Sequence, residues 1–218
     1  MGAAYIDNDI LHKLSAYGLL QDLLSIRPLG GNNFFMLGAA RYIVAKKLQK
    51  KPPVRGAEVS LAEFESALAQ ISAIEPTNEE VRLAADLEYA AQQLNVDFDP
   101  GESLLCAALL IRRGEYIFTG DKRAVLALQA LLDAHAVPAE VRNRVACLEQ
   151  LFLLLLECKE HAEIRSAVCG EQLVDRALAN CFSCCSTTTS VESWREGLAS
   201  YIRDLLTKAP GVLLAYNC

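Results

Sequence analysis

The stretch Gly101-Glu102-Ser103-Leu104-Leu105-Cys106-Ala107-Ala108 is followed by Glu115-Tyr116-Ile117-Phe118-Thr119, which leads into Gly120-Asp121-Lys122-Arg123. The first segment predicts an apolar helix with an acid in its first turn, and the second predicts a short strand with an acid just past its end. Parallel α/β folds bring the carboxyl ends of their strands to one edge of the sheet. We therefore expect a parallel α/β fold in which Glu102 and Asp121 approach that edge.

A third acidic site, Asp7-Asn8-Asp9, follows the apolar run Ala3–Ile6, which predicts a short buried strand. Carboxylate oxygens are the ligands that hard cations such as Mg²⁺ and Mn²⁺ prefer. Acids at two strand ends and at one helix start therefore predict a carboxylate pocket for a divalent metal ion. Such a pocket favours a metal-dependent phosphodiesterase, because metals held by carboxylates can activate water and stabilise a leaving oxygen.

The chain as a whole predicts few short strands and many helices. Strands are expected at residues 3–6, 34–37 and 116–119, and helices at 10–24, 39–50, 60–74, 78–94, 102–113, 123–136, 140–160, 163–180 and 193–208. Ser60 and Glu63 have the spacing of a capping box at the start of the 60–74 helix. The pattern predicts an α/β fold, a three-layer α/β/α sandwich with a short central parallel sheet over residues 1–137, and a helical C-terminal extension over 138–218 packed on it.

Composition agrees with a packed globule and limits the classes of partner. The 218 residues are 52% hydrophobic and only 22% charged, with a net charge of -6. This acidic balance gives no overall basic surface for nucleic acid, so RNA contact would need local patches such as residues 41–51 or Lys122-Arg123. The longest apolar run, Leu151–Leu156, is far shorter than a membrane span, and no secretory signal is recognisable. We expect a soluble, cytoplasmic protein with no membrane contact.

Eight cysteines are present, and in a cytoplasmic chain of this size they are expected to be reduced thiols. Cys158-x-x-His161 and Cys181-x-x-Cys184 have spacings that zinc ligands also show. Both pairs lie in or beside predicted helices without a bracketing turn, which favours ordinary core positions over a zinc site. Zinc stays an alternative for this segment.

The order of the acidic sites resembles that of PIN-domain ribonucleases over roughly the first 130 residues. In that family an aspartate closes the first strand, an acid opens the helix before the fourth strand, and Thr-x-Asp follows that strand. Asp7, Glu102 and the pair Thr119 and Asp121 match these positions. The resemblance implies a metal-dependent endoribonuclease that uses Mg²⁺ or Mn²⁺ and acts on single-stranded or structured RNA, with Asp7, Glu102 and Asp121 as catalytic metal ligands.

Further residues receive roles in this interpretation. Asp9 and Glu149 are candidate additional metal ligands, Lys122, Arg123 and Arg41 are candidate phosphate contacts, and Thr119 and Asn8 are candidate donors that orient the carboxylates. The family's usual aspartate at the helix start is Glu102 here. Its remaining acid lies on the helix after the second strand, whereas residues 37–47 contain none, and Glu58 and Glu63 are the nearest candidates.

Alternative interpretations stay open. A non-catalytic PIN-like module that binds RNA or a protein partner is favoured by the missing acid, and the apolar C-terminal third would also allow a homodimer. A haloacid-dehalogenase-like phosphatase would use Asp7 as nucleophile and Asp9 as acid, with Thr119 and Lys122 in supporting roles, although its late acidic pair is absent. Finally, Asp7, Asp9, Glu102 and Asp121 all stand where acids commonly cap helices.

Overall fold

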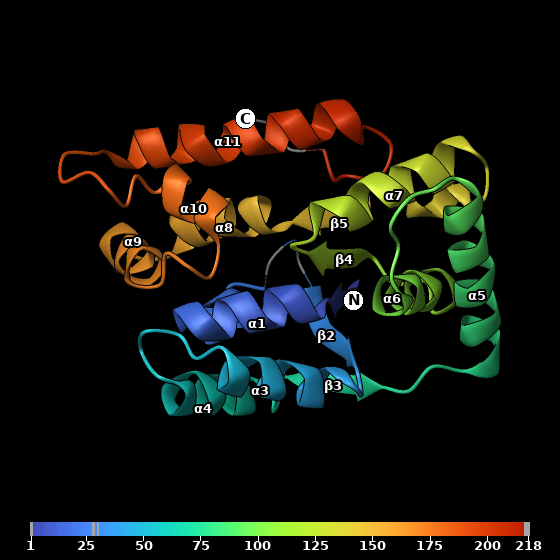
Figure 1. Ribbon diagram of the computed structural model, residues 1–218, viewed down its shortest axis with the longest axis horizontal. Helices are drawn as coiled ribbons and strands as arrows, with labels where there is room; N and C mark the ends of the chain where they lie inside the picture. The colour runs from blue at the N-terminus through green and yellow to red at the C-terminus, as the bar shows by residue number, and fades with distance from the viewer. Residues whose placement is uncertain (1, 28, 30, 216–218) are drawn as a thin grey trace.

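A five-stranded, wholly parallel sheet forms the centre of the molecule in the computed structural model, which describes residues 2–27, 29 and 31–215 (Figure 1). The strand order is β3-β2-β1-β4-β5. The strands are β1 (Gly2–Ile6), β2 (Gly31–Leu37), β3 (Ile71–Ile74), β4 (Tyr116–Thr119) and β5 (Val145–Cys147). Every neighbouring pair is parallel, as the acids after successive strands led us to expect.

Helices cover both faces of the sheet, which confirms the predicted three-layer α/β/α sandwich. On one side lie α1 (Asn8–Tyr17), α2 (Leu20–Ser25), α3 (Ala40–Lys50), α4 (Ala57–Ala67) and α8 (Leu148–Cys158). The other side carries α5 (Asn78–Gln93), α6 (Pro100–Ile111) and α7 (Lys122–Asp133), with a short 3-10 turn at Ala139–Val141. The remaining helices, α9 (His161–Gly170), α10 (Arg176–Cys181) and α11 (Val191–Lys208), pack on α8 and on one another, and α11 also reaches α7.

Two predicted helices are each divided in two. Gly18 adopts φ +72°, a left-handed conformation that ends α1, so the helix expected over 10–24 becomes α1 and α2. The helix expected over 163–180 ends at Gly170, and a loop separates it from α10. Asp175 starts α10 by accepting a hydrogen bond from the backbone N–H of Leu178 at 3.0 Å.

Two strands were wrongly predicted as parts of helices. The helix expected over 60–74 ends at Ala67, and Ile71–Ile74 forms β3 beside β2. The helix expected over 140–160 starts only at Leu148, because Val145–Cys147 forms β5 beside β4. Such short apolar runs fit a strand or a buried helix equally well, and pairing with a neighbouring strand decides between them. Because β5 lies beyond residue 138, the central sheet extends into the region predicted to be a helical extension.

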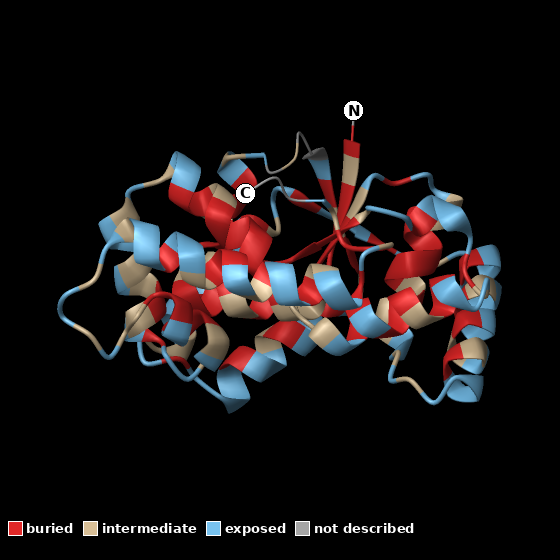
Figure 2. Cartoon of the chain, turned by 90° about the horizontal axis from the view of Figure 1, so that it is seen from above, coloured by how far each residue is buried: buried red, intermediate tan, exposed pale blue. Residues whose placement is uncertain are grey.

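The apolar interior is continuous from the sheet into the C-terminal helices. Figure 2 shows the strands mostly buried, with exposed residues in the edge strand β3, whereas the helices are exposed along their outer sides. Phe152 of α8 makes edge-to-face contacts with Tyr17 of α1 and with Phe182, which also packs near Trp194 of α11. Aromatic pairs of this kind bury large areas and prefer tilted or edge-on geometry. The described residues after 138 therefore share one core with the α/β layers.

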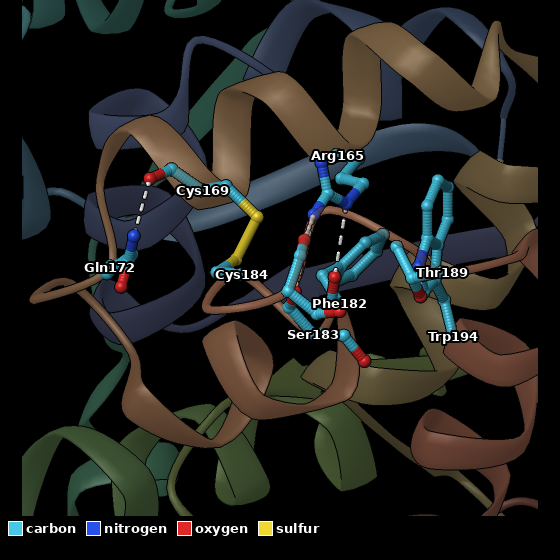
Figure 3. The surroundings of a disulfide bond; sticks show 9 residues. Arg165, Cys169, Gln172, Phe182, Ser183, Cys184, Thr189 and Trp194 are labelled. Carbon is cyan, nitrogen blue, oxygen red and sulfur yellow. Dashed lines mark hydrogen bonds between the residues drawn. A yellow bond between two sulfur atoms is a disulfide. The ribbon is translucent and has the colours of Figure 1, made fainter.

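A disulfide joins Cys169 of α9 to Cys184, just after α10 (Figure 3). The expectation that all eight cysteines are reduced is therefore wrong for this pair. Arg165 lies beside the bond and donates to the backbone oxygens of Phe182 and Ser186, at 3.3 and 2.8 Å. The disulfide and this arginine together fix the segment after α10 onto α9.

No helix in the described part of the chain is both long and apolar enough to cross a membrane.

Candidate functional site

The candidate site lies at the topological switch point of the sheet, between β1 and β4, where the chain changes the direction in which it adds strands. From β1 the chain proceeds to β2 and β3 on one side, and it then crosses over to place β4 and β5 on the other. Ligands of open α/β sheets bind outside the carboxyl ends of the strands at this reversal point. Here Asp7 directly follows β1 and Thr119 ends β4, and the backbone N–H of Asp7 still bonds to Phe118 O at 2.9 Å. The fold thus brings together two of the sequence-predicted residues.

Asp7 is buried, with 8% of its surface exposed. Thr119 Oγ1 donates a hydrogen bond to Asp7 Oδ2 at 3.1 Å, and the backbone N–H of Asp121 in turn donates to Thr119 Oγ1 at 3.2 Å. Burial raises the pKa of Asp7 to about 6, and the nearby negative charge of Asp9 adds to the effect, while hydrogen bonds from Thr119 and the backbone of Asn8 oppose it. Asp7 is therefore oriented by the protein, and it forms no ion pair with the residues that the structure describes.

Glu102 faces the same cavity from the first turn of α6. Asp99 caps this helix, and the backbone N–H of Asp99 donates to Glu102 Oε2 at 2.9 Å, so the two residues form a capping box. Burial nevertheless raises the pKa of Glu102 to about 8, with further contributions from the charges of Asp99, Asp121 and Asp7. Glu102 is thus a helix-capping residue that also lies within electrostatic reach of the other acids.

The cavity between these carboxyls is small, about 20 Å³, which is room for one water-sized group. Its lining is mostly apolar and consists of Asp7, Phe98, Glu102, Leu105, Ile117, Thr119, Ala124, Val125, Leu128 and Val145. The apolar walls explain why the carboxyl groups are poorly solvated and why their pKa values are high.

A larger and more open cavity of about 340 Å³ adjoins the first one. It is lined by Asp97, Phe98, Asp99, Glu102, Asp121 and Arg123. Glu102 and Phe98 line both cavities and therefore stand between them. The site consists of an inner apolar chamber with two acids and an outer acidic chamber wide enough for a ligand group.

Asp121 lies in the outer chamber and caps α7, with Oδ1 accepting the backbone N–H of Arg123 at 2.8 Å. The Arg123 guanidinium also contacts the same carboxylate, with Nη2 2.8 Å from Oδ2. Burial alone would raise the pKa of Asp121, but the hydrogen bonds from the Arg123 side chain and backbone outweigh it, and the pKa is lowered. Asp121 therefore forms an ion pair, whereas Asp7 and Glu102 form none with the described residues, although the charge of Arg123 also acts on Glu102.

Other predicted ligands have partners elsewhere. Asp9 Oδ2 lies 2.6 Å from Lys13 Nζ, and Asp9 Oδ1 lies 3.5 Å from Lys47 Nζ. Glu63 Oε1 accepts the backbone N–H of Gln21 at 3.0 Å, so this acid ties α4 to α2. Neither acid lines either chamber of the candidate site.

Glu149 and Lys122 form an ion pair in which the glutamate is buried and the lysine is partly exposed. Glu149 is 3% exposed in the first turn of α8, and its Oε1 lies 2.7 Å from Lys122 Nζ. The same ammonium lies 4.2 Å from the centre of the Tyr201 ring on α11. These contacts join α7 to the C-terminal helices. Arg41 is exposed on α3 next to Tyr42 and lines neither chamber.

Within the described part of the chain, no group of three or more His, Cys, Asp or Glu side chains is arranged to hold a metal ion. This applies to the carboxylates and also to the predicted zinc set, in which Cys184 is bonded to Cys169 and His161 Nε2 lies 2.7 Å from Leu156 O. The carboxylates suit Mg²⁺ or Mn²⁺ in their chemistry, because two acids that form no ion pair with the described residues face one cavity. They meet in pairs, Asp7 with Glu102 and Glu102 with Asp121.

Sequence reasoning missed the part played by the loop before α6. Phe98 stands between the chambers, and Asp97 and Asp99 line the outer one. The signal that could have found Glu102's partner is Asp99-Pro100-Gly101-Glu102, which has capping-box spacing with proline at the first helical position.

Comparison with known proteins gives no relative: no protein family, curated protein or solved structure matches this chain.

Proposed function

We propose that the two-chambered carboxylate site binds a divalent cation, Mg²⁺ or Mn²⁺, and hydrolyses phosphodiester bonds in RNA. The observation that carries the proposal is the pair of poorly solvated carboxyls, Asp7 and Glu102, which face one cavity at the reversal point of the sheet. Their raised pKa values mean that a positive charge would be bound strongly there.

Asp7 and Glu102 would hold the ion, and Asp121 would join them from the outer chamber. A bound divalent ion would supply an activated water and a positive charge for the scissile phosphate. Thr119 keeps Asp7 in place through the hydrogen bond to Oδ2. The capping bond to Asp99 occupies only Oε2 of Glu102, which leaves Oε1 available as a ligand.

The outer chamber offers the phosphate of RNA few protein cations. Arg123 is the basic residue among its lining side chains, against four acids. Its guanidinium would contact a phosphate only by leaving Asp121, which a metal ion on the Asp121 carboxylate would favour. Phe98 offers an aromatic surface at the chamber boundary on which a base could stack.

A non-catalytic binding module is the second candidate. It is favoured by the protein cations that already neutralise Asp9, Asp121 and Glu149, and by the absence of a three-acid group in the described residues. A phosphatase of the haloacid-dehalogenase type has less support, because Lys13 holds the Asp9 carboxylate that would act as its acid.

The test combines calorimetric titration of Mn²⁺ with cleavage of a mixed single-stranded RNA pool. Wild type is expected to bind Mn²⁺ and cleave RNA, and Asp7→Asn and Glu102→Gln are expected to lose both. Asp86→Asn, on the exposed side of α5, is the matched control because it also removes one carboxylate. It should change neither Mn²⁺ binding nor RNA cleavage. Titrations in buffers of different ionisation enthalpy at pH 7 should show proton release from Glu102, whose pKa is about 8.

Manganese binding without cleavage would favour the second candidate. The absence of both signals in wild type would refute the metal site itself.

A further inference from the structure

The disulfide between Cys169 and Cys184 borders a cavity of about 490 Å³ that lies along α9. One face of α9 and the segment before α11 form its walls, which consist of Ala162, Arg165, Ser166, Cys169, Gly170, Thr187, Thr189 and Trp194. Both bonded cysteines are only half-buried. Disulfides that thiols can reach are the ones that are readily reduced. A thiol in solution can therefore approach Cys169 from this cavity.

Residues 183–188, which include Cys184, lie between two anchors that do not involve the disulfide. Phe182 is fully buried, and its ring lies 5.7 Å from those of Phe152 and Trp194. At the other end, Trp194 Nε1 donates to Thr189 Oγ1 at 2.7 Å. Breaking the sulfur–sulfur bond would therefore release the short span between the anchors and leave the surrounding helices in place.

Besides the disulfide, hydrogen bonds hold residues 183–188 to the neighbouring helices. Arg165 on α9 donates to the backbone oxygens of Ser183 and Ser186 at 3.3 and 2.8 Å (Figure 3). The backbone N–H of Cys184 donates to Ala179 O at 3.0 Å. Because water can replace such hydrogen bonds, their net contribution is modest. The covalent bond is thus the strongest restraint that keeps this span on α9.

We propose that the Cys169–Cys184 disulfide is a reversible redox switch. When a dithiol reduces it, residues 183–188 separate from α9 and the cavity beside Trp194 opens, while α9, α10 and α11 stay folded. The switch does not depend on the nuclease proposal, since none of the residues that line this cavity lines either chamber of the carboxylate site.

The exchange proceeds in two steps. A thiolate of the dithiol attacks Cys169 Sγ, the bond to Cys184 breaks, and Cys184 leaves as a thiolate that takes up a proton. The second thiol of the reagent then attacks the reagent sulfur of the mixed disulfide. Cys169 leaves as a thiolate and is protonated, and the reagent becomes a cyclic disulfide. The protein gains the two electrons and two protons that the reagent loses, and a small disulfide such as oxidised glutathione reverses the reaction.

The test is hydrogen exchange, followed by mass spectrometry, on native protein before treatment, with dithiothreitol, and after reoxidation with oxidised glutathione. Dithiothreitol is expected to speed exchange in peptides that cover residues 183–188 by roughly tenfold or more, and reoxidation should restore the slow rate. Exchange in α10 and α11 should stay slow throughout. Trp194 is the one tryptophan of the chain and is 6% exposed, so reduction should also increase quenching of its fluorescence by acrylamide.

Two variants separate the switch from other thiol chemistry. Cys184→Ser cannot form the disulfide and should exchange rapidly at residues 183–188 with or without dithiothreitol. Cys185→Ser removes the exposed free cysteine next to it and should behave as wild type does.

Three results would overturn the proposal. In the first, dithiothreitol reduces the bond only after urea has unfolded the protein, so that the disulfide is closed to thiols in the native state. In the second, reduction speeds exchange throughout α9, α10 and α11, so that the bond holds the fold and not one span. In the third, reduction leaves exchange at residues 183–188 unchanged.

Discussion

Asp7→Asn should stabilise the protein in a way that depends on pH. The Asp7 carboxyl has a pKa of about 6 in the folded protein, against 3.8 for an unperturbed aspartate. Because the folded pKa is the higher one, the folded state binds the proton more tightly. The contribution of the protonated Asp7 carboxyl to wild-type stability is therefore fully present below pH 3.8 and is lost as the pH rises through 6. Asparagine cannot ionise and avoids this loss.

The size of the effect follows from the difference in pKa. A shift of about 2 pK units corresponds to about 3 kcal/mol, and the burial of Asp7 means that solvent screening takes little from it. Relative to wild type, the variant should gain about 0.5 kcal/mol in free energy of unfolding at pH 4 and about 3 kcal/mol at pH 8. Thr119 can still donate to the asparagine side-chain oxygen, so the local packing should survive.

The assay is urea unfolding of wild type and variant at several pH values without divalent metal. Asp86→Asn, an exposed aspartate on α5, controls for the loss of one negative charge. A difference between wild type and Asp7→Asn that stays constant from pH 4 to pH 8 would refute the reasoning. It would mean that Asp7 is well solvated and that no poorly compensated carboxyl exists at this edge.

Three further changes test contacts within the C-terminal part of the chain and between it and the α/β layers. Glu171→Gln weakens two charge-assisted hydrogen bonds from the backbone N–H groups of Val54 and Arg55 and should lower the free energy of unfolding in urea by about 1.5–3 kcal/mol. Lys122→Met leaves the buried carboxylate of Glu149 without its ion pair and should cost up to about 3 kcal/mol, and adding Glu149→Gln should recover part of this loss; a double variant less stable than the single one would contradict the pairing. Replacing Cys169 and Cys184 by alanine opens a loop whose ends are 15 residues apart and should cost about 3 kcal/mol under oxidising conditions, and a dithiol should destabilise wild type but not this variant.

The layer architecture could be predicted from sequence because its signals are local and repeated. Tyr116–Thr119 is a short run of strand-forming residues followed by glycine, so β4 was predicted. The capping box predicted for Ser60 and Glu63 is wrong, because α4 already begins at Ala57. The strands β3 and β5, of four and three residues, were missed because each lies inside a longer pattern that was predicted as one helix, over 60–74 and over 140–160. In runs this short, pairing with a neighbouring strand outweighs local preference.

Only part of the candidate site could be predicted from the sequence. Position after a strand or at a helix start identified Asp7, Glu102 and Asp121, and the parallel sheet brings Asp7 close to Thr119. Nothing in the order of residues shows that Arg123 turns back onto Asp121, or that Lys122 points instead toward Glu149. These pairings depend on side-chain directions and on how close the first turns of α7 and α8 lie, which are set only in three dimensions.

The outer edge of β5 is covered by residues 211–214. Val145 pairs with Leu213 in a parallel bridge, its N–H donates to Val212 O at 3.1 Å, and the N–H of Leu214 donates to Val145 O at 2.7 Å. The Gln150 side chain adds a bond to Leu214 O at 2.8 Å. During synthesis on the ribosome, β5 would therefore emerge well before the segment that covers it, and contacts so distant along the chain form slowly.

An uncovered strand edge can pair with another chain. We expect a nascent or truncated form that ends before residue 211 to self-associate through β5, detectable by light scattering, whereas the chain with residues 211–214 should not. The bridge at Val145 thus acts as protection against aggregation that becomes available only late in synthesis.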